Sequence, residues 1–235
     1  IPSAVVKEHN RGNTKVIEQM FLDNMQNNNI THRVSSVYLD DVYLPEKAVH
    51  RSLETLELVR REVENSPNLR ILEDADDIQS STTNTDTVNF ILGLEGAEPI
   101  QNNLTLLDSY YRLGVRTMTL THSRRNYVAE GAPIFHEERS RTIGGLSDLG
   151  IDVVKRMNEL GMVIDISHVN SESFWDVLEH NDDIPVIASH SNANAVNQSP
   201  RNLTDEQLQA VSEVNGVVGA VAGVNVFVGE EDSTV

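Results

Sequence analysis

Residues 161–169 read GMVIDISHV, a short apolar run that ends in a histidine. Gly161 follows a segment of helical period that begins at Ser147, so the run predicts a strand that is entered directly from a helix. Near-continuous Val, Ile, Leu and Met is typical of strands that are covered on both faces of a parallel sheet. Three further apolar runs also end at an ionisable residue, a glutamate in the first and a histidine in the other two: FILGLEG at 90–96, TMTLTHS at 117–123 and PVIASHS at 185–191.

The alternation of these runs with segments of helical period predicts repeated βα units in one α/β domain over residues 1–235. Helical spacing predicts a helix that starts at Pro45 and places Leu53, Leu56 and Val63 on one apolar face. Further helices are expected to start at Ser147, at Ser171 as an N-cap, and at the capping-box pair Thr204 and Gln207. Residues 1–29 and 124–145 do not follow the pattern. The expected strands are 34–39, 88–94, 117–121, 162–167, 186–189 and 217–227.

Composition excludes several functions. The 235 residues carry 18 basic and 36 acidic side chains, a net charge of -18, which disfavours nucleic acid and anionic membranes as partners. No cysteine is present, so metal ligands must come from His, Asp and Glu. An acidic, lysine-poor surface suits high salt, and a halophilic source is our hypothesis beside that of an ordinary acidic protein.

The sequence also leads to expectations about cellular location. No apolar run reaches the roughly 18 residues that a membrane-spanning helix needs. The chain begins at Ile1 without a basic and apolar signal region. We therefore expect a soluble protein, cytoplasmic in preference to secreted, that is either processed or a piece of a longer chain.

An ionisable residue follows each of four successive strands: Glu95, His122, His168 and His190. Carboxyl ends of parallel strands meet at one edge, where ligands bind. A single strand-terminal histidine is more often structural, but four residues in register favour a site. A carboxylate with two imidazoles is a common ligand set for a divalent metal ion. Zn²⁺ held in this way lowers the pKa of a bound water molecule to ~7. Glu95, His168 and His190 are thus candidate metal ligands for hydrolytic chemistry.

Three other residues have two interpretations each. His122 is either a third imidazole ligand or a donor to the oxygen of a reacting carbonyl. Arg201 is either an anchor for a substrate carboxylate or a solvated loop residue. Asp165 lies on the opposite strand face from His168 by alternation, so it is either structural or a support for the metal ligands.

The order and spacing of these motifs resemble the membrane (renal) dipeptidase family over residues 34–227. The resemblance implies a (β/α)8 TIM-type barrel with a binuclear zinc centre that hydrolyses dipeptides. It implies that Glu95 bridges the two metals, that His168 and His190 complete the ligands of the second, that His122 contacts the substrate near the scissile carbonyl, and that Arg201 binds its carboxylate. The motifs are GLEG at 93–96, LTHS at 120–123, GLS at 145–147, LGMVIDISH at 160–168, SHSN at 189–192 and SPRNLTD at 199–205.

Two parts of the family pattern are missing. The family begins with a strand that ends in a His-x-Asp pair, which ligates the first metal, and ends with a strand that carries a ligand aspartate. The first expected strand here, 34–39, does not end in such a pair, and the last expected strand ends at 227. We therefore expect a barrel that lacks the first and last strands of the family, in a fragment of a longer chain, and at most one weakly held metal.

The leading hypothesis is a zinc-dependent dipeptidase that uses a metal-activated water on a small dipeptide, with a homodimer as a possible assembly. A second enzyme hypothesis is a binuclear amidohydrolase that acts on another amide or on a lactam. A hypothesis of a different class is a metal-poor homologue that has no catalytic activity and serves as a binding subunit. Metal content and a panel of dipeptides and cyclic amides distinguish the three.

Overall fold

The computed structural model describes residues 1–81, 86–133 and 144–221, which form two compact units. The first unit is Ile1–Glu95 with Ser109–Thr117, and the second is Gly96–Asp108 with the described part of Met118–Val235. Helix α5 (Leu104–Arg112) and strand β4 (Val115–Thr119) contribute residues to both units. The prediction of a single domain over residues 1–235 stays a prediction.

The first unit is built on parallel strands. Its strands are β1 (His32–Tyr38), β2 (Leu69–Ile71), β3 (Val88–Glu95) and the first part of β4. Their order is β1-β3-β4, and β2 also pairs with β3. Tyr38 is level with Glu95, so β1 and β3 end together. Phe90, Leu92 and Leu94 are fully buried, as expected for a strand that is covered on both faces.

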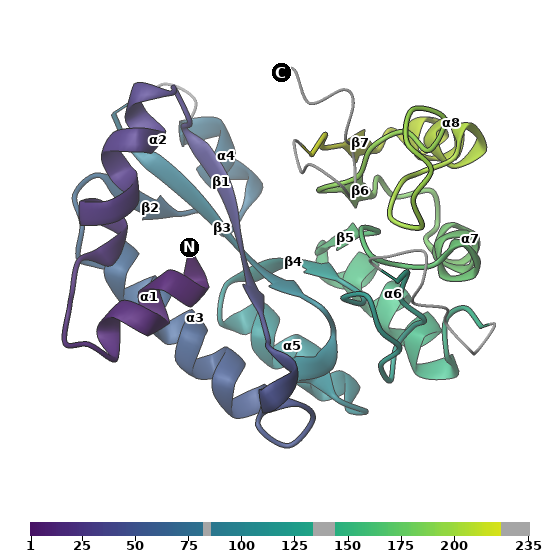
Figure 1. The fold of residues 1–235 in the computed structure, drawn as a ribbon, viewed down its shortest axis with the longest axis horizontal. Helices are drawn as coiled ribbons and strands as arrows, with labels where there is room; N and C mark the ends of the chain where they lie inside the picture. The colour runs from purple at the N-terminus through teal and green to yellow at the C-terminus, as the bar shows by residue number, and fades with distance from the viewer. Residues whose placement is uncertain (82–85, 134–143, 222–235) are drawn as a thin grey trace. The chain divides into compact units, whose positions relative to one another are not determined.

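Helices cover this sheet. One of them lies within residues 1–29, which the sequence pattern left unassigned. Helix α3 (Ala48–Glu64) packs on β1 and β2, and α1 (Pro2–His9) packs beside α3 and on β1 (Figure 1). Leu53, expected on the inner face of α3, is 39% exposed, whereas Leu56 is buried. The unit also holds a π-helical turn, η1 (Glu18–Leu22), a 3-10 turn, η2 (Asp41–Tyr43), and helices α2 (Asp23–Asn27) and α4 (Ala75–Ser81).

The second unit repeats the βα pattern. Its strand order is β4-β5-β6-β7, and the β5–β6 and β6–β7 pairs are parallel. The strands β5 (Val163–Asp165), β6 (Ile187–Ala188) and β7 (Val217–Val218) are shorter than expected, and residues 222–227 lie outside the described residues. The helices are α6 (Asp148–Leu160), α7 (Ser171–His180) and α8 (Asp205–Glu213) (Figure 1). The unit also holds a 3-10 turn, η3 (Glu98–Ile100).

Local sequence signals set the helix ends. The Ser147 hydroxyl accepts a hydrogen bond from the Gly150 amide, and Gly161 ends α6 at a φ of 70°. Thr204 and Gln207 form the expected capping box of α8. The predicted cap of α7 was wrong by one position. Asn170 is the N-cap, because its side-chain oxygen accepts from the Ser173 amide at 2.8 Å, and Ser171 is the first helical residue.

Candidate metal and substrate site

The three candidate histidines come together in the second unit. His122, His168 and His190 follow β4, β5 and β6, so three neighbouring strands deliver them to one edge. The rings of His122 and His168 are 4.2 Å apart between centroids, and those of His168 and His190 are 4.7 Å apart. The Nε2 atoms of His168 and His190 are 2.7 Å apart. The two imidazoles thus present their outer nitrogens to the same point.

A strained turn, not strand alternation, aims His168. Strand β5 ends at Asp165, so the alternation argued from the sequence stops three residues before the histidine. His168 has a φ of 70°, in the left-handed region that costs a residue with a side chain about 1–3 kcal/mol. The turn is held from both sides, because the His168 carbonyl accepts from the Thr121 hydroxyl at 3.1 Å and from the Ala132 amide at 2.6 Å.

The surroundings of His168 keep its ring neutral. Burial lowers the pKa of His168 far below its usual value, and the nearby Arg201, His122 and His190 lower it further. The Asp165 carboxylate opposes these effects but does not outweigh them. Because a neutral imidazole retains a lone pair, this is the form that binds a metal ion. The charge environment therefore fits a ligand role for His168.

Asp165 is buried and accepts four hydrogen bonds, although the sequence left its role open. One carboxylate oxygen accepts from the hydroxyls of Thr119 at 2.9 Å and Ser189 at 2.5 Å. The other accepts from the backbone amides of Ser167 at 3.0 Å and Ser189 at 3.1 Å. Asp165 is only 4% exposed. Its carboxylate therefore links the ends of β4, β5 and β6, the three strands that carry the histidines.

Arg201 is buried within the segment of residues 192–202, which lies in the connection between β6 and α8. It is 3% exposed, which excludes a solvated loop arginine, and its charge is close enough to His168 to lower the pKa of that ring. Hydrogen bonds fold the segment back on itself. The Asn202 side chain accepts from the Asn192 amide at 3.1 Å and donates to the Asn197 carbonyl at 2.9 Å.

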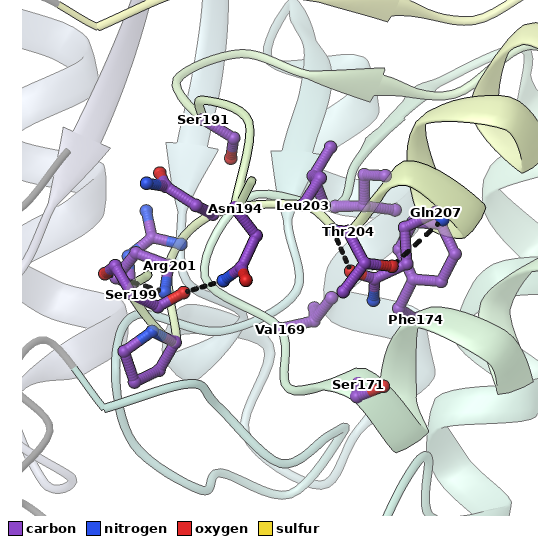
Figure 2. A pocket seen from close by; sticks show the side chains of 13 residues that line it. Val169, Ser171, Phe174, Ser191, Asn194, Ser199, Arg201, Leu203, Thr204 and Gln207 are labelled. Carbon is purple, nitrogen blue, oxygen red and sulfur yellow. Dashed lines mark hydrogen bonds between the residues drawn. The ribbon is translucent and has the colours of Figure 1, made fainter. Parts of the chain in front are cut away.

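Beside Arg201 is a cavity of about 170 Å³ with apolar and polar walls. Figure 2 shows Arg201 and Ser199 on one side of it and Phe174 on the other, where Thr204 and Gln207, the capping pair of α8, also line it. Val169 and Leu203 add apolar surface. A fixed cation next to a small apolar space is suited to a short organic anion.

Glu95 is the last residue of β3 and belongs to the first unit, whereas the histidines belong to the second. The next residue, Gly96, has a φ of 104° and donates its amide to the Thr119 carbonyl at 3.0 Å. The grouping of Glu95 with His168 and His190 stays a prediction.

Two other acidic residues lie outside the set of predicted site residues. Burial raises the pKa of the Glu98 carboxyl, and Arg124, whose Nε lies 3.2 Å from Glu98 Oε1, opposes that rise. The sequence does contain one His-x-Asp spacing, His180-Asn181-Asp182, but the structure places it at the C-terminal end of α7 and not at the end of a strand.

Comparison with known proteins points to one family. The family model described as membrane dipeptidase (peptidase family M19) matches residues 4–235. Mouse Dipeptidase 3 is 34% identical over 200 residues, which are 85% of this chain and 40% of that protein. Among the residues that the structure describes, no helix has both the length and the apolar character for crossing a membrane.

Two solved structures resemble the chain. A structure described as dipeptidase AC, a metallopeptidase of family M19, has a TM-score of 0.77 at 28% identity. The match covers 85% of this chain and 61% of the chain of that structure. A metallopeptidase from Rhodobacter sphaeroides, solved with a phosphinate mimic of the dipeptide L-Ala-D-Ala, has a TM-score of 0.68 at 31% identity and covers 75% of this chain and 50% of its own. The predicted fold, a TIM-type α/β barrel without its full set of strands, is thereby confirmed. The chain spans about half the length of the relatives that it matches.

Proposed function

We propose, because the chain belongs to the membrane dipeptidase family (peptidase family M19), that this protein hydrolyses dipeptides with the help of a bound metal ion. The observation that carries the proposal is the convergence of His122, His168 and His190 within the unit that also buries Arg201. This unit combines imidazole ligands with a cation for the carboxylate of a substrate. The dipeptide mimic bound to the Rhodobacter sphaeroides metallopeptidase supports the same substrate class.

We assign the metal to Glu95, His168 and His190, with Zn²⁺ as the ion. The convergence of the two Nε2 atoms on one point and the lowered pKa of His168 support two imidazole ligands of one cation. Zn²⁺ bound by such a set supplies a nucleophilic water at neutral pH and polarises a carbonyl. The family pattern implies a second metal, but its His-x-Asp and C-terminal Asp ligands are not among the residues assigned here.

The protein's own side chains then orient the dipeptide. The Arg201 guanidinium is proposed to bind the C-terminal carboxylate with two parallel hydrogen bonds, and the cavity beside it takes the C-terminal side chain. The walls of Val169, Phe174 and Leu203 favour a small apolar group. His122, whose ring centroid lies 4.2 Å from that of His168, is proposed to donate a hydrogen bond to the scissile carbonyl oxygen as negative charge develops there.

Metal removal tests the proposal. The protein at full length is treated with a chelator, dialysed and assayed against L-Ala-D-Ala and a matched lactam before and after Zn²⁺ is restored. Dipeptide hydrolysis should be lost on chelation and recovered with Zn²⁺, because the nucleophile depends on the ion. Cleavage of the lactam alone would favour the amidohydrolase. Absence of bound metal together with absence of turnover would favour a non-catalytic subunit.

A further inference from the structure

We propose that Asp165 positions His190 through the hydroxyl of Ser189 and thereby fixes which ring nitrogen of His190 faces the metal. The inference rests on the proposed function only in taking His190 as a ligand. The Ser189 hydroxyl lies 2.5 Å from Asp165 Oδ2 and 2.7 Å from His190 Nδ1, so one oxygen joins the carboxylate to the ring. No covalent step is involved.

The direction of each hydrogen bond follows from the donors available. Asp165 accepts from two backbone amides and from the Thr119 hydroxyl as well as from Ser189, the bonding of an ionised carboxylate that only accepts. Ser189 has a single hydroxyl proton, and it donates that proton in its hydrogen bond to the Asp165 carboxylate. The Ser189 oxygen is left to accept, so the proton on His190 must sit on Nδ1.

A proton on Nδ1 leaves the lone pair of neutral His190 on Nε2. His190 Nε2 lies 2.7 Å from Nε2 of His168. A hydrogen bond between the two rings would need a proton on one of these two nitrogens. The relay removes His190 as the source of that proton. The lone pair of His190 is then directed at the space that the proposed cation would occupy.

The sheet itself holds the relay in place. Asp165 pairs with Ile187 in the β5–β6 register, and Ser189 lies two residues further along the same edge. The Ser189 amide donates to Asp165 Oδ1 at 3.1 Å, which fixes the backbone beneath the hydroxyl. The His190 amide donates to the Ser167 hydroxyl at 3.1 Å and holds the next residue as well. The backbone of the two strands therefore fixes the geometry of the relay.

Zinc affinity gives the first test, by competition with a chromophoric chelator on the full-length protein. Ser189→Ala should weaken zinc binding about 10- to 100-fold, the usual range for the loss of a partner of a ligand. Ser189→Thr keeps the hydroxyl at an exposed position and should stay near the wild-type affinity. Thr119→Val is the matched control, because it removes the other hydroxyl on the same Asp165 oxygen but leaves the relay intact. Equal losses in Ser189→Ala and Thr119→Val would overturn the proposal.

The tautomer of His190 gives the second test and needs neither metal nor substrate. In the metal-free protein labelled with ¹⁵N-histidine, the His190 ring should carry its proton on Nδ1 in the wild type, and this preference should be lost in Ser189→Ala. A wild-type ring with its proton on Nε2 would overturn the relay. Should the protein fail to cleave dipeptides while the tautomer and the zinc affinity respond as stated, the proposed function falls and the relay stands.

Discussion

At Arg201 the sequence offered two environments, and the structure selects the buried one. An arginine after a strand-end histidine is compatible with solvent or with a site, because neighbouring residues in sequence do not determine burial. The 3% exposure of Arg201 and its influence on the pKa of His168 place its charge beside the histidines. A buried guanidinium offers planar, paired donors that lysine lacks.

Arg201→Lys tests the carboxylate anchor. We expect KM for a dipeptide to rise about 10- to 100-fold, because a charge-assisted hydrogen bond contributes about 1.5–3 kcal/mol, with a smaller change in kcat. Steady-state kinetics on the metal-loaded protein measure the split. A dipeptide with a C-terminal amide is the control, because it lacks the carboxylate and should be handled alike by wild type and variant. An unchanged KM for the free dipeptide would contradict the assignment.

Within the second unit, the start of α7 shows how an element boundary is decided. Asn170 and Ser171 are both good N-cap residues, and the cap was expected at Ser171. The Asn170 side chain accepts from the Ser173 amide and also donates to the Gly144 carbonyl at 2.8 Å. The additional bond to Gly144, which is distant in sequence, favours the earlier start of the helix.

The two cap residues make a matched pair of variants. Asn170→Ala should lower the free energy of unfolding by about 1 kcal/mol, because it leaves the Ser173 amide without its cap. Ser171→Ala should change that free energy by less than about 0.5 kcal/mol, since surface helical positions tolerate alanine. Urea denaturation of both variants beside the wild type measures the difference. A larger effect at Ser171 than at Asn170 would show that the helix begins one residue later.

For the whole molecule, the dominant long-range feature is the net charge of -18. Like charges distributed over a folded chain repel one another and destabilise the compact state. Salt weakens this repulsion, since the Debye length falls from about 10 Å at 0.1 M to about 3 Å at 1 M. A halophilic source, which stays a hypothesis, would exploit this dependence.

The melting temperature should therefore rise between about 0.1 M and 1 M NaCl. Differential scanning calorimetry measures it, and KCl serves as a second salt because screening depends on ionic strength and not on the cation. A rise in one salt alone would indicate specific ion binding. A melting temperature that is flat or falling in both salts would contradict the screening argument.

Local and periodic features could be predicted from the sequence. The βα alternation, the Ser147 and Thr204 caps and the Gly161 ending depend on neighbours within a few residues, and all appear in the structure. Helices α1 and α2 were missed, because their buried residues, such as Val5 and Met25, are sparse among polar neighbours and pack only through tertiary contacts.

The fold class, the family and the residue types at the strand ends follow from the chain's periodicity and motif order, which are properties of the sequence. How those residues act together depends on the three-dimensional packing. Three features depend on atoms from separate strands or loops: the positive φ of His168, the burial of Arg201, and the link from Asp165 through Ser189 to His190. Packing brings these atoms to hydrogen-bonding distance of one another. That distance cannot be predicted from a local sequence pattern, because the atoms come from segments that are far apart in the chain.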